Sequence, residues 1–481
     1  MAHTFFWHDY ETFGINPRKD RPAQFAGIRT DADLNEMGDP VEVFCRPAPD
    51  YVPDAASCLV TGITPQRCLE RGVPEDVFAR HIEAALAEPC TVGVGYNTIR
   101  FDDEFTRFLF WRNLIDPYGR EWQNGCGRWD LLDVVRMAYA LRPDGIVWPR
   151  HADGKPSFKL EHLSAANGLA HAAAHDAVSD VRATIALARL LRDRQPKLFE
   201  FAFSLHKKDR VAAELGLPTV QAHAKPFIHI SGMFPAESGC LAVMWPLASH
   251  PSNKNELIAW DLAHDPRELV GLRADAIRER LFTASADLPE GVRRLPVKTV
   301  HLNKSPMVVG NLKTLTPDRA QAWGVDLAQA LQHAQAARDL PDMSAVWSAV
   351  FSRSPQTAGV PEVDEDLYGG FVSNADRRRL NQLRGLTPEA LALDRTGFED
   401  GRLGELVWRY RARSFPQTLS PEDQARWTQL CRSRLIEGAA GARTVQALFD
   451  QIDELSESTD ERGNEVLHAL YDYAEGIAPE L

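Results

Sequence analysis

The chain has 481 residues, more than a single hydrophobic core usually organises, so we expect two or three domains. Its hydrophobic fraction of 44% and charged fraction of 25% are typical of a globular fold and exclude a disordered chain. The formal net charge of −13 argues against a general polyanion binder, because negative potential repels phosphate at long range. Any nucleic-acid contact must therefore depend on a local basic groove.

The cysteines are odd in number and scattered, and no two of them form a C-x-x-C pair. This distribution indicates reduced core residues of a cytoplasmic protein and argues against a disulfide framework or a zinc site. The chain enters its first apolar segment at Thr4 without a basic leader, and no later run approaches the ~18 apolar residues of a membrane span. We therefore expect a cytoplasmic location and no membrane partner. The seven cysteines are Cys45, Cys58, Cys68, Cys90, Cys126, Cys240 and Cys431.

The first ~195 residues alternate between strand and helix signals, as in an α/β domain. The predicted strands, rich in β-branched or aromatic residues, are Thr4 to Trp7, Ala23 to Thr30, Val41 to Arg46 and Thr91 to Tyr96. The predicted helices, with apolar residues three or four apart, are Asp103 to Asn113, Asp130 to Leu141, Leu160 to Asn167 and Asp176 to Arg192. Three early strands followed by helix–strand alternation favour a ribonuclease H-like sheet, and we assign it residues 1–195.

After a break at Pro196 the pattern changes twice. Residues 196–352 begin with a short basic helix and continue with strand-like runs separated by Pro, Gly and Asn, which predicts a small β-rich domain. Residues 355–481 lack strand signals and show helical periodicity with prolines at the joints, which predicts an α-helical domain. The helix is Lys207 to Leu215, and the strands are Phe227 to Ile230, Leu241 to Trp245, Glu256 to Asp261 and Val297 to Leu302.

Two acidic residues follow the first predicted strand, Asp9 and Glu11. A period of two places both side chains on one face of a strand, where they can share a cation. An isolated D-x-E is more often a solvated surface pair. This pair, however, ends an apolar strand, where charge is unfavourable unless a cation compensates it, so its position favours a metal site.

A second acidic pair, Asp102 and Asp103, begins a predicted helix after the apolar strand at Thr91 to Tyr96. Taken alone, an aspartate at a helix start is most often an N-cap that accepts backbone N–H bonds. Two neighbouring aspartates allow both interpretations. We expect one of them to cap the helix while the other, Asp102, faces the site.

The third segment contains His175 and Asp180, five residues apart. On one continuous helix their side chains would be about 140° apart, so they could not face one site. If the helix begins at Asp176, which is then its N-cap, His175 lies on the preceding loop and reaches the cleft that Asp180 faces. A lone histidine is more often a tolerated polar residue. Several converging carboxylates and a neutral base are nevertheless what phosphodiester cleavage with two divalent cations requires.

Read together, HDYETFG, GYNTIRFDDE and HDAVSD resemble the three motifs of the DEDDh exonuclease superfamily. Further segments are similar to the bacterial exonuclease I family over nearly the full length of the chain. They are RPAQFAGIRTD, RWDLLDVVRMAYALRPDGI, PSFKLEHLSAANGL, and FPQTLS after WRYRAR. The resemblance implies a multi-domain α/β protein: a ribonuclease H-like exonuclease domain, an SH3-like β-barrel domain and an α-helical C-terminal domain.

The resemblance also implies a role for each motif residue. Asp9 would bridge two Mg²⁺ ions, for which Mn²⁺ is a possible substitute. Glu11 and Asp180 would hold the ion that carries the attacking water, Asp102 would support the second ion, and His175 would be the general base. All five positions are present. An imidazole with a pKa near 6.5 suits proton removal at neutral pH.

A strand of DNA that reaches an acidic cleft needs basic and aromatic neighbours. Arginines neutralise phosphates, and rings stack on unpaired bases at about 1–3 kcal/mol each. The alternative is ordinary surface arginines and core aromatics, which we favour for Trp129 and Tyr139. Lys207, Lys208 and Arg210 could extend the path or form a solvated linker. The predicted substrate contacts are Arg107, Tyr118, Trp122, Arg136 and Lys159, together with Glu11.

From the resemblance we expect a 3′–5′ exonuclease that degrades single-stranded DNA to 5′-mononucleotides in repair and recombination. The two extra domains would close around one strand, excluding a duplex and retaining the polymer between cuts. The implied partner is the acidic C-terminal tail of single-stranded-DNA-binding protein, and we expect a monomer. Two alternatives remain open: an RNA-trimming member of the superfamily, and an inactive adaptor that binds single-stranded DNA or its binding protein.

Overall fold

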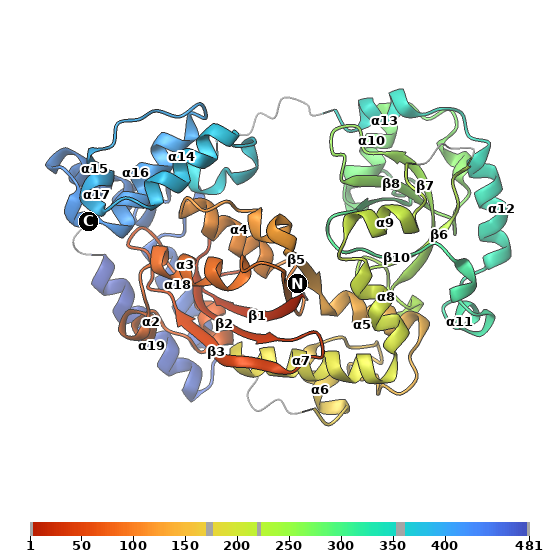
Figure 1. Cartoon of the computed structure of the whole chain (residues 1–481), viewed down its shortest axis with the longest axis horizontal. Coiled ribbons are helices and arrows are strands. Elements are labelled where there is room, and N and C mark those ends of the chain that lie inside the picture. Colours follow the sequence, from red (N-terminus) through yellow and green to blue (C-terminus); the bar gives the residue numbers. More distant parts are fainter. Residues whose placement is uncertain (1–2, 170–176, 219–222, 353–360, 479–481) are drawn as a thin grey trace. The chain divides into compact units, whose positions relative to one another are not determined.

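The computed structural model divides into two compact units, each containing its own five-stranded sheet (Figure 1). The described residues are 3–169, 177–218, 223–352 and 361–478. The first unit comprises 1–127, 171–185 and 358–481, and the second comprises 128–170 and 186–357. Within the described ranges, none of the helices is long and apolar enough to cross a membrane.

The sheet of the first unit has the strand order β3-β2-β1-β4-β5, and the chain passes into the second unit within β5. Strand β1 pairs antiparallel with β2 and parallel with β4, which places β1 at the centre. The strands are β1 (Thr4–Thr12), β2 (Pro22–Thr30), β3 (Glu36–Phe44), β4 (Thr91–Gly95) and β5 (Gly127–Asp130). This mixed sheet with helices is the α/β architecture that the sequence predicts.

Two helices cover one face of this sheet (Figure 1). Phe6 and Tyr10 of β1 lie in one buried cluster with Phe78 of α3 and Leu109 of α4. Because side chains alternate along a strand, Asp9 and Glu11 are on the opposite face of β1 from these apolar residues. The helices that belong to the sheet region are α1 (Ala55–Thr61), α2 (Pro65–Arg71), α3 (Glu75–Leu86), α4 (Asp102–Arg112) and α7 (Ala177–Arg194).

The C-terminal region is helical, as predicted, and contributes to the core of the first unit. Phe13 and Phe44 from the sheet region share a buried cluster with Trp427, Leu448 and Leu470. A second cluster joins Phe108 and Trp111 of α4 to C-terminal leucines. The helices are α14 (Asn374–Arg384), α15 (Pro388–Leu393), α16 (Arg402–Ser414), α17 (Pro421–Leu435), α18 (Val445–Ser456) and α19 (Glu461–Ile477).

The sheet of the second unit is antiparallel, with the order β10-β6-β7-β8-β9. Its strands are β6 (Phe227–Ile230), β7 (Leu241–Ser249), β8 (Glu256–Asp261), β9 (Val297–His301) and β10 (Met307–Val309). Trp245 and Trp260 lie in its core with Ile277 and Trp347, which come from helices. The helices of this unit are α5 (Leu131–Leu141), α6 (Leu160–Ala166), α8 (Pro196–Ser204), α9 (Lys208–Glu214), α10 (Ala274–Phe282), α11 (Pro317–Ala322), α12 (Leu327–Arg338) and α13 (Ser344–Val350).

Candidate active site

Asp9 and Glu11 lie on β1 just beyond its parallel pairing with β4, which ends at Trp7 and Val94. Both still pair with β2, opposite Ala26 and Gln24, so the backbone of this stretch is held on one side. Ligands of α/β sheets are commonly bound beyond the carboxyl ends of parallel strands. The fold therefore presents this acidic pair at an edge suited to a ligand.

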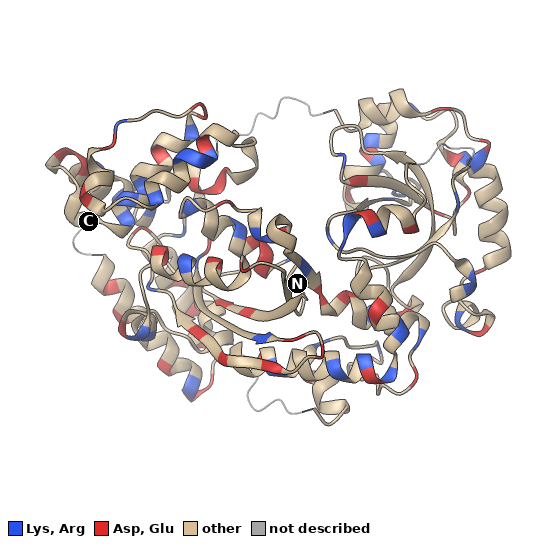
Figure 2. Cartoon of the chain, in the orientation of Figure 1, with Lys and Arg blue, Asp and Glu red and all other residues tan. Residues whose placement is uncertain are grey.

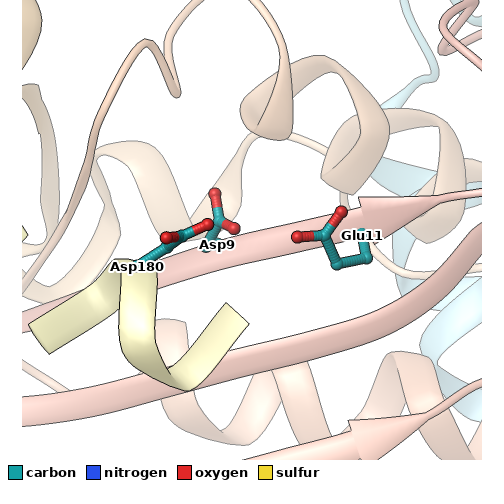
Figure 3. Close-up of side chains that lie close together, drawn as sticks. All are labelled: Asp9, Glu11 and Asp180. Atoms are coloured by element: carbon teal, nitrogen blue, oxygen red, sulfur yellow. The ribbon is translucent and has the colours of Figure 1, made fainter. Parts of the chain in front are cut away.

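Asp180 completes a close group of carboxylates with Asp9 and Glu11 (Figure 3). It lies in the first turn of α7, and one ligand oxygen from each of the three residues lies within 4.8 Å of the others. Asp9 and Asp180 are half-buried and Glu11 is buried. Carboxylate oxygens are the ligands that Mg²⁺ and Mn²⁺ prefer, so the donor set fits a divalent cation.

The side chain of Asp102 is hydrogen-bonded to the backbone of β1 at Tyr10, between Asp9 and Glu11. Its Oδ1 accepts a hydrogen bond of 3.0 Å from the backbone N–H of Tyr10. The Tyr10 hydroxyl lies 3.0 Å from Thr106 Oγ1, and the Thr106 hydroxyl donates to the Asp102 carbonyl at 2.8 Å. These contacts fix the start of α4 against the catalytic strand. Asp102 is outside the group that meets within 4.8 Å, yet the charge of Asp9 still acts on it.

The prediction that one aspartate of this pair caps α4 is wrong. The N-cap residue is Phe101, and no side chain caps the helix. Asp103 instead forms a buried ion pair with Arg120, whose Nη2 lies 2.5 Å from Asp103 Oδ1. Sequence reasoning missed Arg120, although two adjacent aspartates at one helix start are a signal that a counter-charge is needed.

Burial and repulsion between neighbouring carboxylates raise the pKa values of Asp9 and Asp102. Removal from water, together with the charge of Asp180, raises the pKa of Asp9 to about 8. Burial and the charge of Asp9 likewise raise the pKa of Asp102 well above its ordinary value. Carboxylates that repel one another in this way attract a cation, because its positive charge offsets the repulsion.

His175, the predicted general base, lies outside the described residues, as does Asp176, the predicted N-cap of the following helix. Asp180 itself is described, and Thr184 donates to its carbonyl at 2.9 Å, as in an ordinary helical turn. The structure thus brings Asp9, Glu11 and Asp180 together with Asp102 beside them.

Besides Glu11, three predicted substrate contacts are in the first unit. Trp122 is 65% exposed, Tyr118 is half-buried, and the Arg107 guanidinium lies 5.2 Å from the Tyr118 ring centroid. Arg107 is only 5% exposed, and its Nε and Nη2 donate to both carboxylate oxygens of Glu121 at 2.7 and 2.9 Å. A phosphate contact by Arg107 would therefore require an exchange of partners.

Tyr118 and Trp122 line a hollow of about 550 Å³ in the first unit, a size suited to a nucleotide-sized ligand. Its other wall comes from the C-terminal region and includes Phe371, which is 92% exposed, together with Arg377 and Arg378. Sequence reasoning did not select these three residues. The available signal was an aromatic residue, Phe371, followed within a few residues by Arg377 and Arg378. This signal is weak because the region contains many other arginines (Figure 2).

The other two predicted contacts, Arg136 and Lys159, are in the second unit. Arg136 lies on α5 and pairs with Asp133 at 2.7 Å. Lys159 is 59% exposed and lies 3.6 Å from Glu161. The alternative of core aromatics is confirmed for Trp129 and Tyr139, which are 0% and 6% exposed. All seven cysteines are free thiols, and five of them are buried as predicted, whereas Cys90 and Cys126 are half-buried.

Sequence models of known families define the class of protein. Residues 6–188 match the exonuclease family, 206–353 match the exonuclease I SH3-like domain, and 361–477 match the exonuclease I C-terminal domain. The predicted fold class, a ribonuclease H-like exonuclease domain followed by SH3-like and helical domains, is thereby confirmed. The chain has the fold and the acidic site of a 3′–5′ exodeoxyribonuclease.

Full-length relatives narrow this class. Exodeoxyribonuclease I of Escherichia coli K12 is 44% identical over 479 residues, which is 98% of each chain. A solved structure of exonuclease I from Methylocaldum szegediense has a TM-score of 0.93 at 45% identity, covering 99% of this chain and 100% of the other. E. coli exonuclease I in complex with a dA16 oligonucleotide has a TM-score of 0.92 at 42% identity, with the same coverage. The chain belongs to the exonuclease I family.

Two further solved structures, the first of them of the E. coli protein, differ in what they contain. One is a zinc-bound form of its complex with single-stranded DNA, with a TM-score of 0.92 at 42% identity. The other is described as SSB/exonuclease I in complex with the inhibitor CFAM, with a TM-score of 0.89 at 41% identity. Both cover 99% of this chain and 100% of the other.

Proposed function

We propose that this enzyme degrades single-stranded DNA from its 3′ end and releases 5′-mononucleotides with the help of two Mg²⁺ ions. The observation that carries the proposal is the convergence of Asp9, Glu11 and Asp180 within 4.8 Å at the end of β1. The oligonucleotide complexes of the E. coli relative support the choice of substrate, because that protein aligns with this chain over its full length.

Each acidic residue has a place in this proposal. Asp9 would hold both ions, Glu11 and Asp180 would complete the first site, and Asp102 would hold the second ion. When bound, the two ions supply positive charge to the attacking and leaving oxygens of the phosphodiester. Mn²⁺ accepts the same oxygen ligands and is expected to substitute. The zinc-bound relative supports a divalent-cation requirement without fixing the physiological metal.

His175 is proposed as the general base that accepts a proton from the attacking water. An imidazole of ordinary pKa, near 6.5, is largely neutral at physiological pH and can accept this proton. A substitution of His175 should therefore spare metal and DNA binding while lowering turnover. The carboxylates cannot replace it efficiently, because each of them is needed as a ligand.

The substrate strand is proposed to contact both units. Trp122 and Tyr118 offer stacking faces in the hollow of the first unit, and Glu11 contacts the terminal nucleotide. Arg107, Arg136 and Lys159 are proposed to face phosphates, for which Arg107 would have to release Glu121. The solved structure of SSB/exonuclease I supports a contact with the C-terminal tail of single-stranded-DNA-binding protein. A cytoplasmic monomer that acts in repair and recombination completes the proposal.

A strand labelled at its 5′ end or at its 3′ end tests the reaction. With Mg²⁺, wild-type enzyme should shorten a 5′-labelled strand stepwise and release the 3′ label at once as a mononucleotide. Chelation, or the substitution Asp9→Ala, should abolish both signals. An RNA oligonucleotide of the same sequence should be degraded much more slowly. Faster cleavage of RNA would indicate an RNA-trimming enzyme, and DNA binding without cleavage would indicate an adaptor.

A further inference from the structure

Beneath the catalytic strand, on the face opposite Asp9, lies a buried guanidinium that the proposed reaction does not use. Arg120 belongs to the short 3₁₀ turn Gly119–Glu121, and it is 3% exposed. A Cβ atom built on Gly93 of β4 would lie 3.3 Å from Arg120 Nη1 and 3.6 Å from His8 Nε2. The absence of a side chain at position 93 thus leaves the space that the guanidinium occupies beside β1 and β4.

Arg120 joins two parts of the molecule that the proposed function uses separately. Its Nη2 bonds Asp103, the neighbour of Asp102. It also lines the hollow that contains Tyr118 and Trp122. Asp102 in turn accepts from the Tyr10 N–H, between Asp9 and Glu11. A continuous series of contacts therefore runs from the stacking residues to the metal-binding carboxylates.

The 3₁₀ turn Gly119–Glu121 makes a second ion pair with α4, one helical turn beyond Asp103. Glu121 binds Arg107 through both carboxylate oxygens, next to the Asp103 contact of Arg120. Two consecutive residues of the segment thus hold two residues of α4 that are one helical turn apart. The segment cannot move relative to the start of α4 unless both contacts break.

Stability alone does not account for Arg120. Among the described residues its Nε and Nη1 have no hydrogen-bond partner, and both ring nitrogens of His8 also lack one. Burial lowers the pKa of His8 to about 3, so His8 adds no charge. A buried ion pair with unused donors is seldom better for stability than apolar residues of the same size. Its use is more readily explained by the geometry that it imposes.

We propose that Arg120 is a positioning residue, which holds the start of α4 through Asp103 and thereby fixes Asp102 at the metal site. It also ties the segment from Tyr118 to Trp122 to that same helix start. This inference rests on the proposed function for the role of Asp102. It predicts that losing Arg120 weakens metal binding even though Arg120 touches no metal ligand directly.

Arg112 provides a matched control at the other end of α4. Its side chain is 1% exposed, its Nε lies 3.1 Å from Glu75 Oε1, and among the described residues two of its nitrogens also lack hydrogen-bond partners. Arg112→Gln therefore breaks a similar buried pair on the same helix, away from the carboxylates. Any general effect of loosening α4 should appear in both variants.

The experiment measures Mn²⁺ binding without turnover, from the electron paramagnetic resonance signal of the free ion, at 10 °C. Arg120→Gln should weaken Mn²⁺ binding by about 10- to 100-fold, the range found for residues that orient metal ligands. Arg120→Lys, which keeps the charge, should weaken it less. Arg112→Gln should stay within about twofold of wild type, because Arg112 pairs with Glu75 and does not contact Asp103. Equal weakening by Arg112→Gln, or unchanged binding in Arg120→Gln, would overturn the proposal.

Two further measurements keep the outcome clear. If Arg120→Gln does not fold, Asp103→Asn breaks the same pair from its other side and should give the same loss. In the double variant the two losses should not add, because each substitution already removes the contact. Failure of wild type to cleave single-stranded DNA would refute the proposed function and leave the Mn²⁺ comparison between variants valid.

Discussion

Two groups of carboxylates in the first unit have opposite surroundings. Asp50 and Asp364 are buried among arginines: Arg413 Nη2 lies 2.8 Å from Asp50 and 2.6 Å from Asp364, and Arg434 Nη1 lies 2.5 Å from Asp50. Although burial alone would raise the pKa of Asp364, Arg413 and the neighbouring guanidiniums hold it well below its ordinary value. The chain supplies the counter-charges itself.

In the candidate active site, Asp9 and Asp102 have no such compensation from lysine or arginine. Among the described residues neither forms an ion pair, and the pKa of each is raised by burial and by a neighbouring carboxylate. The difference teaches what each group is for. A carboxylate cluster neutralised by arginines joins elements of the fold, whereas one that repels itself is built to bind cations from solution.

The largest expected effect is from removing a carboxylate from the uncompensated group. Asp9→Ala should lower kcat by at least about 10³-fold, because it removes several kcal/mol of metal-dependent stabilisation of the transition state. The fold should be retained, since a self-repelling charge is lost. Turnover of labelled single-stranded DNA and a thermal unfolding curve without metal measure the two effects. A large loss of stability would show that the comparison is wrong.

The opposite result is expected in the arginine-rich group. Arg413→Met should destabilise the protein by about 3–5 kcal/mol, because it leaves Asp50 and Asp364 buried with fewer counter-charges. Activity per folded molecule should change little. Denaturant unfolding gives the stability, and active-site titration gives the folded fraction. Unchanged stability would mean that these ion pairs do not hold the C-terminal helices on the sheet region of the first unit.

Trp122→Ala should leave both groups of carboxylates unchanged. It therefore tests substrate binding separately from metal binding and from fold stability. Loss of one stacking face should cost about 1–3 kcal/mol of single-stranded-DNA affinity. KM should rise while kcat, Mn²⁺ binding and stability stay close to wild type. Leu69→Ala, which replaces another exposed apolar residue of the same unit outside the hollow, is the control. An equal rise in KM for both variants would remove Trp122 from the substrate path.

The smallest expected effect is on the pH dependence of the metal-free protein. The pKa of Asp9 is raised from 3.8 to about 8, so between these values the folded state binds more protons than the unfolded state. Stability of the metal-free protein should therefore fall as pH rises from 4 to 8, by on the order of 1 kcal/mol, since Asp9 is only half-buried and solvent screens part of the effect. Mg²⁺ should stabilise more at pH 8 than at pH 6. Asp9→Asn should flatten this dependence.

Much of the fold could be predicted from local patterns. The strands Phe227–Ile230 and Glu256–Asp261 occur where alternation and flanking turn residues place them. The four-residue strand β5 was missed, because Gly127–Asp130 contains Arg128 and Asp130 and shows no apolar alternation. Strand β3 begins at Glu36, earlier than predicted. The prediction missed its exposed first half because Gly, Asp and Pro, which occur there, are uncommon in strands. Pairing with neighbouring strands makes β5 and the first half of β3 extended, and the local sequence does not reveal these partners.

The middle region has more helix than its prediction as β-rich suggests. Helices α10, α12 and α13 pack on its sheet, and α12 buries only alanines along its length. A stripe of alanines gives a weak apolar signal, so periodicity did not reveal it.

The acidic residues of the candidate site could be predicted, because their spacing on strand and helix carries the information. The partner of Asp103 could not be. The local sequence indicates a helix cap at Asp103, because capping is the usual role of an aspartate at a helix start. The deciding contact is with Arg120, 17 residues further along and brought close only by the folded chain. Similarly, the bidentate contact of Glu121 with Arg107 leaves no trace in either local sequence.

The bond from the Tyr10 amide to Asp102 has a consequence for how this enzyme can vary. A main-chain donor is present whichever amino acid occupies position 10, with the single exception of proline. The orientation of the Asp102 carboxylate therefore does not depend on which side chain occupies position 10 of the central strand. Chemical synthesis offers a way to remove it alone: an ester in place of that one amide would delete the hydrogen while leaving every side chain untouched.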